Sequence, residues 1–91
     1  MPKLILNMEV KDWDQFKKIY IEENNSEREK VGIKTIFIGQ EMCKDNKVYA
    51  LFDMPTNNSM REFSNKPETQ KMVNEAGIIL ETLDGVVVQE D

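Results

Sequence analysis

The chain has 91 residues, of which 40% are hydrophobic and 32% charged, a composition typical of one globular domain rather than of a disordered segment. The formal charge of −5 disfavours nucleic acid as a partner, because phosphate contacts require a basic surface. Apolar runs are short and the N-terminus lacks a signal-peptide pattern, so we expect no membrane span and no membrane partner. The single cysteine, Cys43, excludes an internal disulfide and fits a reducing cytoplasm. We therefore predict one cytoplasmic domain over residues 1–91.

The first predicted elements are a strand and an amphipathic helix. Residues 4–10 alternate between apolar and polar side chains, which predicts a strand with one apolar face. Asp12 is a candidate N-cap for the helix that follows, and Gln15 is placed to complete a capping box. The helix pauses at Asn24-Asn25, or Ser26 caps a further turn. Its apolar stripe recurs at three- and four-residue steps: Trp13, Phe16, Ile19 and Tyr20.

Two strands joined by a hairpin are predicted next. They cover residues 33–41 and 47–54, and Asp45-Asn46 supplies the turn chemistry between them. Regular alternation in the first of the two would place Thr35 and Phe37 on the same face. The second is apolar on both faces, so each of its sides must be covered.

The remaining chain predicts a second helical region and a last strand. Thr56 or Asn57 can cap a helical turn, Pro67 is placed to open the next helix, and Gly77 to end it. Residues 78–89 are expected to form a last strand or a bent pair of segments, with a kink, bulge or tight turn at Asp84-Gly85. The order βαββαβ favours an α+β class, ferredoxin-like fold: a four-stranded antiparallel sheet with both helices on one face.

The second face of this sheet is predicted to be apolar as well. Two helices cover only one face, yet the second, third and last strands carry apolar residues on both sides. The uncovered face would expose several hundred Å², and hiding it is worth on the order of ten kcal/mol before the cost of association. We therefore predict that the chain pairs with itself as a homodimer through the sheet face.

Four segments resemble the dimeric α/β-barrel superfamily, in particular the small-domain branch that includes antibiotic-biosynthesis monooxygenases and stress-responsive proteins. They are Asp12-Trp13-Asp14-x-Phe16, Gly32-Ile33, residues 48–53, and Pro67-Glu68-x-x-x-Met72 running to Glu75-Ala76-Gly77-Ile78. The resemblance implies a dimeric α/β barrel in which two sheets meet in a shared core. It also implies a ligand pocket between each sheet and its helices.

The same resemblance bears on cofactors. Monooxygenases of this kind oxidise electron-rich aromatic compounds without a metal or bound cofactor, whereas haem-degrading members place a histidine on the iron. This chain contains no histidine, so haem ligation of that type is not expected. The absence of histidine also removes Ser-His and Cys-His nucleophiles and most zinc sites. We predict no cofactor and no metal.

Polar residues on two strands are the candidate ligand-binding groups. Asn7 and Glu9 share one face of the first strand, and Tyr49 and Asp53 share one face of the third. Packing as dimer-interface or rim groups is one interpretation of the four. The other is a patch that binds a small molecule, with Asp53 or Glu9 as a base. Trp13 is either a core anchor or a pocket residue. The predicted ligand-binding set is Asn7, Trp13, Tyr49 and Asp53.

Three functions are compatible with these patterns. The first is a homodimer of unassigned activity that binds a small apolar or aromatic molecule. The second is a cofactor-independent monooxygenase acting on an aromatic substrate, and the third is a structural or regulatory interaction module. Arg61, at the start of the second helical region, is a candidate clamp for an anionic ligand.

Overall fold

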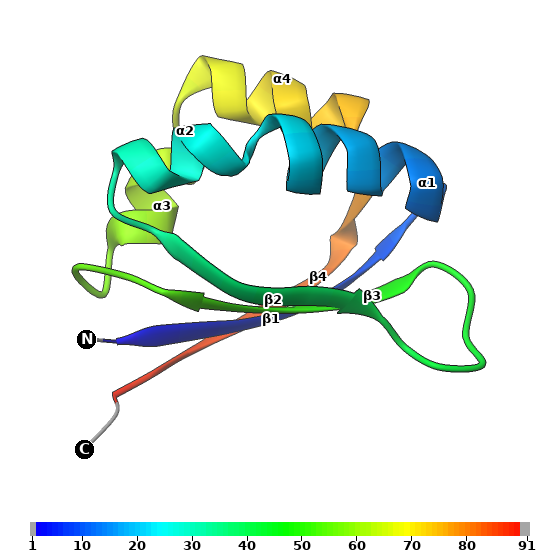
Figure 1. Cartoon of the computed structure of the whole chain (residues 1–91), viewed down its shortest axis with the longest axis horizontal. Helices are drawn as coiled ribbons and strands as arrows, with labels where there is room; N and C mark the ends of the chain where they lie inside the picture. Colours follow the sequence, from blue (N-terminus) through cyan, green and yellow to red (C-terminus); the bar gives the residue numbers. More distant parts are fainter. Residues whose placement is uncertain (1, 90–91) are drawn as a thin grey trace.

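Four antiparallel strands form one sheet in the order β2-β3-β1-β4. The computed structural model describes residues 2–89, and within them every helix lies on the same side of the sheet (Figure 1). The strands are β1 (Lys3–Val10), β2 (Lys34–Gln40), β3 (Lys47–Asp53) and β4 (Ile78–Val88). This arrangement confirms the predicted ferredoxin-like α+β fold. No helix among the described residues is long and apolar enough to cross a membrane.

The first helical segment is divided into three parts, α1 (Trp13–Phe16), a π-helix η1 (Lys17–Glu23) and α2 (Asn25–Lys30). The predicted N-cap is confirmed, since Asp12 Oδ1 accepts a hydrogen bond from the Asp14 amide at 3.1 Å. The capping box is wrong, because Gln15 donates instead to the backbone oxygen of Glu75 and so ties α1 to the end of α4. A seven-residue π-helix is unusual, since most are single-turn bulges and many lie at functional sites.

The second helical region consists of α3 (Ser59–Ser64) and α4 (Pro67–Glu75). Asn58 precedes α3 as its N-cap, so the predicted caps one and two residues earlier are wrong. Pro67 stands at the first position of α4, as predicted. Gly77 follows α4 with φ +76°, the left-handed conformation that ends a helix and that glycine adopts without strain.

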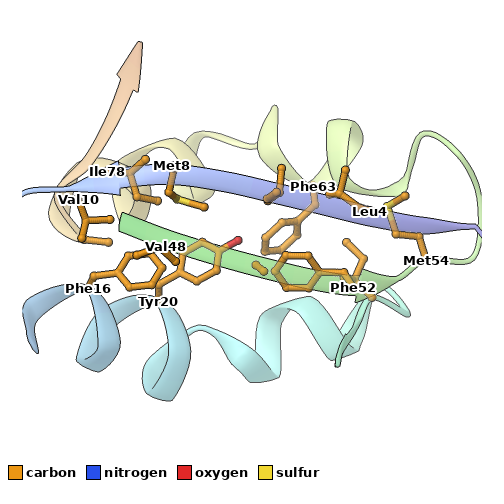
Figure 2. Packing of buried hydrophobic residues seen from close by; sticks show 14 residues of the cluster. Leu4, Met8, Val10, Phe16, Tyr20, Val48, Phe52, Met54, Phe63 and Ile78 are labelled. Atoms are coloured by element: carbon orange, nitrogen blue, oxygen red, sulfur yellow. The ribbon is translucent and has the colours of Figure 1, made fainter. Parts of the chain in front are cut away.

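The core lies between the helices and the inner face of the sheet. Leu4, Leu6, Met8 and Val10 of β1 are all buried and alternate with more exposed residues. Figure 2 shows Phe16 and Tyr20 reaching from the helix layer towards Val48 and Phe52 of β3. The helices thus cover one face only, and within residues 2–89 no helix lies on the other face, which we call the outer face (Figure 1).

A bulge in β2 overturns one predicted face assignment. Thr35 pairs with Phe52, whereas Phe37 pairs with the next residue along β3, Leu51, so Ile36 is an extra residue. Thr35 therefore shares the inner face with Phe52, and Phe37 lies on the outer face, 52% exposed. The prediction that these two residues share a face was wrong because one inserted residue reverses the alternation.

A larger bulge interrupts β4, earlier than predicted. Asn7 pairs with Asp84 and Glu9 with Ile79, so residues 80–83 of β4 stand opposite Met8 alone. The Thr82 hydroxyl replaces part of the missing ladder: its Oγ1 accepts from the Glu9 amide at 2.8 Å and donates to the Ile79 oxygen at 2.6 Å. The irregularity predicted at Asp84-Gly85 is present but lies just before these two residues, which both pair regularly with β1.

Removing the Thr82 hydroxyl should destabilise the β4 bulge. Thr82→Val keeps the shape of the side chain but leaves two backbone groups without their partner, and we expect a loss of about 1–2 kcal/mol in the free energy of unfolding. Thr82→Ser is the matched control, because it retains the hydroxyl while losing only a methyl group. Urea unfolding of the three proteins measures the difference. Equal stability of the valine and serine variants would contradict this role of the hydroxyl.

Candidate functional site

The described residues enclose an apolar pocket of ≈ 390 Å³ on the inner side of the sheet. It lies between the β1/β4 half of the sheet and the helices α3, α4 and η1. This volume is within the range of small-molecule sites, about 300–1,000 Å³. The wall is predominantly apolar, with a few amide and hydroxyl groups and no Asp, Glu, Lys, Arg or Cys: Leu6, Met8, Tyr20, Met60, Ser64, Gln70, Val73, Asn74, Ile78, Leu80 and Leu83.

The bulge in β4 shapes this pocket. Leu80 and Leu83, which begin and end the bulged segment, are both pocket residues and are 59% and 42% exposed. A regular strand would have paired residues 80–83 along β1, so the extra residues change the direction of these side chains. The pocket therefore depends on a local irregularity that hydrophobic alternation does not reveal.

Tyr20 is the titratable residue of the pocket wall. Its ring stacks on Phe16 at 5.1 Å between centroids, and the Arg28 guanidinium carbon lies 4.4 Å from the centroid of the Tyr20 ring. Burial raises the pKa of Tyr20 above its ordinary value, although the nearby Arg28 charge and its hydrogen bond oppose that rise. Tyr20 therefore presents a neutral phenol at physiological pH.

Arg28 is a buried cation behind Tyr20. It donates from Nη1 to the Tyr20 backbone oxygen at 2.9 Å and to Asn24 Oδ1 at 3.1 Å, and from Nε to Thr35 Oγ1 at 3.3 Å. Nη2 is buried and has no hydrogen-bond partner among the described residues. Burial lowers the pKa of Arg28, while Tyr20 and Glu29 oppose the shift. An arginine remains charged under such a shift, so Arg28 is a cation held by neutral acceptors.

The outer face carries one apolar row that crosses the whole sheet. Phe37 pairs with Leu51, Leu51 with Ile5, and Ile5 with Val86, so one residue from each strand contributes. Ile5 and Val86 are 44% and 53% exposed. The outer face thus has a continuous apolar row that is flanked by polar ones.

The predicted ligand-binding residues of the strands lie in these flanking rows. Asn7 and Tyr49 are direct neighbours on the outer face, in one row with Asp84. Asp53 lies on the other side of the apolar row, where its Oδ1 is 2.6 Å from Lys3 Nζ. The structure therefore brings Asn7 and Tyr49 together and separates them from Asp53.

Asn7, Tyr49 and Asp53 each have a neighbour of complementary chemistry on the outer face. Lys47 Nζ donates to Asn7 Oδ1 at 3.1 Å, and the Tyr49 hydroxyl donates to Glu41 Oε1 at 2.7 Å. This last hydrogen bond lowers the pKa of Glu41 and raises that of Tyr49. The Tyr49 phenol is therefore kept protonated and the Glu41 carboxylate ionised.

Trp13 lies on the opposite side of the sheet from the other three predicted residues. It is half-buried at the start of α1 and stacks on Phe16, with 5.9 Å between ring centroids. It packs against the core and is not among the residues that line the ≈ 390 Å³ pocket.

Sequence reasoning missed most of the pocket wall and also Arg28. Ser64, Gln70 and Asn74 were unremarkable polar residues of a helical region, and no spacing distinguished them from solvent-facing neighbours. Arg28 lies in a charged segment, NSEREK, which predicts an exposed turn. The only available signal for its burial was Tyr20 two turns earlier on the same helical face.

Comparison with known proteins identifies the fold. No family model matches the chain, and no curated protein matches it in sequence. A solved structure of a candidate antibiotic biosynthesis monooxygenase from Bordetella bronchiseptica superimposes with a TM-score of 0.78 at 11% identity, covering 99% of this chain and 96% of that one. SnoaB, a cofactor-independent oxygenase from Streptomyces nogalater, gives 0.71 at 12% identity, covering 98% and 91%.

A third match is an uncharacterised NIPSNAP domain protein from Burkholderia xenovorans, with a TM-score of 0.72 at 12% identity and coverage of 100% and 95%. Identities this low establish likeness of fold and nothing further. The chain has the ferredoxin-like α+β fold that these monooxygenase-like and NIPSNAP structures share.

Proposed function

We propose that this protein is a cytoplasmic homodimer that binds a small apolar or aromatic molecule in the pocket between its sheet and helices. The observation that carries the proposal is the pocket itself. Its ≈ 390 Å³ are lined mainly by aliphatic and methionine side chains, with neutral hydrogen-bonding groups at Tyr20, Ser64, Gln70 and Asn74. Such a wall favours an apolar body whose orientation is fixed by a few hydrogen bonds.

Self-association is supported by the apolar row of the outer face. Ile5 and Val86 leave about half of their surface exposed in the single chain, at the middle and one edge of the sheet. A contiguous apolar patch of this kind is typical of a protein interface. In a dimer with a two-fold axis, the apolar row of one chain can pack against the same row of the other. The flanking polar rows, with Asn7, Tyr49 and Asp53, would then lie at the margin of the interface.

A binding experiment tests the pocket directly. Native mass spectrometry of protein purified from its source cells reports the subunit number and any retained small molecule together. For a defined probe, the dye ANS should bind wild-type protein, and Val73→Trp should reduce that binding by about tenfold, because the indole would fill part of the pocket. Lys71→Trp is the matched control, since Lys71 is exposed on α4 and does not line the pocket. Equal loss in both variants would contradict the proposal.

The second candidate is a cofactor-independent oxygenase. What favours it is the combination of this pocket with a fold like that of SnoaB, which is described as a cofactor-independent oxygenase. The measurement is oxygen consumption with a panel of phenols and quinols. Turnover that Tyr20→Phe lowers while Trp13→Phe leaves it unchanged would support an oxygenase. Absence of turnover with every member of a broad panel would count against it.

A further inference from the structure

The pocket continues into a second cavity along β4. That cavity, also ≈ 390 Å³, shares Leu6, Met60, Ser64 and Leu83 with the first, so the two adjoin and form one groove. The floor of the groove follows β1 from Leu4 to Met8. The four steps along the strand from Leu4 to Met8 span about 13 Å, so the groove is elongated rather than round.

The two ends of this groove differ in chemistry. The end next to Met8 is lined by Val73, Ile78 and Leu80 and holds no charged side chain. The end next to Leu4 is bordered by α3 and holds Arg61 and Asn57. Arg61 is the one charged residue among the described residues that line either cavity.

Arg61 is also available to a ligand. Its side chain is exposed, and no ion pair or side-chain hydrogen bond joins it to another described residue. The chain has more acidic than basic residues, 17 against 12. The described lining of the groove nevertheless contains one cation and no carboxylate, which favours an anionic ligand. A guanidinium forms paired hydrogen bonds with a carboxylate and is well suited to recognise an anionic head group.

Gly85 helps to keep the groove open where the cavities meet. A Cβ at this position would lie 2.7 Å from Leu6 Cδ2 and 3.6 Å from Leu4 Cδ1, both of which belong to groove-lining side chains. Any larger residue would displace the β1 leucines that form the floor. The absence of a side chain here therefore allows β4 to pass close to β1 beneath the groove.

We infer that the groove takes an elongated amphiphile with an anionic head, such as a medium-chain fatty carboxylate, whose apolar chain lies along β1 and β4 and whose carboxylate meets Arg61. The inference rests on the proposed binding function and names the ligand class for the same site. The apolar end accommodates the chain by burial, and Arg61 with Asn57 distinguishes a carboxylate from a neutral head.

The test compares decanoate with its methyl ester by isothermal titration, on the full chain. Wild-type protein should bind the carboxylate about fivefold more tightly than the ester, a modest ratio because an exposed ion pair is weakened by water and salt. Arg61→Gln should remove that difference and leave ester binding unchanged. Lys71→Gln makes the same charge change outside the groove and should preserve the difference. Leu83→Trp should weaken both ligands, because Leu83 lines both cavities.

The outcomes separate this inference from the proposed function. Equal affinity of wild-type protein for acid and ester, or equal effects of Arg61→Gln and Lys71→Gln, would overturn the anionic head while leaving an apolar binding site in place. If neither ligand binds, the inference that the ligand is an amphiphile is refuted. If Val73-dependent ANS binding is retained in that case, the pocket still binds an apolar molecule.

Discussion

Replacing Ile5 with lysine is expected to convert the proposed homodimer into a folded monomer. Ile5 is at the centre of the apolar row, on an interior strand of the sheet, and is paired with Leu51 on one side and Val86 on the other. In a two-fold dimer the substitution brings two like charges into an apolar interface. Such a juxtaposition costs several kcal/mol, so the dimer dissociation constant should rise by about a hundredfold or more.

The folded state of one chain should survive this change. Ile5 is 44% exposed and points away from the helices, so a lysine there meets solvent in the monomer and leaves the inner core intact. Light scattering at micromolar concentration measures the subunit number, and circular dichroism checks the fold. Leu80→Lys is the matched control, since Leu80 is also an apolar residue, is 59% exposed, and lies on the other side of the sheet. A monomeric wild-type protein would refute the pairing altogether.

Fold class and element order could be predicted because they depend on features spread over many residues. The alternation in β1, Pro67 at the start of α4 and Gly77 at its end each agree with the structure, and together they define the βαββαβ order. A prediction that rests on many residues tolerates local errors. The predicted fold was therefore correct although two cap assignments and one strand face were wrong.

The candidate pocket could not be predicted because it depends on single-residue irregularities. The bulge at Ile36 reverses the faces of β2, and the one at residues 80–83 directs two leucines of β4 towards the helices. Neither carries a glycine or proline inside it, and the Asp84-Gly85 signal follows the second bulge without giving its position. The position of a bulge depends on how a strand pairs with its neighbour. The sequence of one strand does not show the register of that pairing.

The outer face has one feature that the sequence predicted and one that it could not predict. Its apolar character was predicted from residues such as Val86 and Leu51, yet the division into one apolar row and two polar rows follows from the register alone. That register also explains why Asn7 and Tyr49 meet and Asp53 does not. Position within a row, rather than residue type, therefore distinguishes interface candidates from margin candidates on this sheet.

Replacing Arg28 with alanine is expected to lower the free energy of unfolding by about 4 kcal/mol. The truncation would leave a cavity next to Phe52 and Tyr20, whose rings lie 5.7 Å and 4.4 Å from the guanidinium carbon. It would also remove the donor that Arg28 Nη1 provides to the Tyr20 backbone oxygen within the π-helix. Both effects come from a side chain with no exposed surface.

Arg28→Met separates these two contributions. Methionine refills much of the space and removes a buried charge that forms no ion pair with a described carboxylate, Glu29 acting on it only at longer range. Its cost should therefore be smaller, about 1–2 kcal/mol, and should come mainly from the Tyr20 backbone oxygen and the Asn24 side-chain oxygen that lose their donor. Urea unfolding measures both variants against Lys71→Ala, an exposed cation whose loss should change stability by less than about 0.5 kcal/mol. Equal destabilisation by alanine and methionine would show that the hydrogen bonds, not the packing, explain why a cation is buried here. A methionine variant as stable as the wild type would instead show that packing alone holds the π-helix against β3.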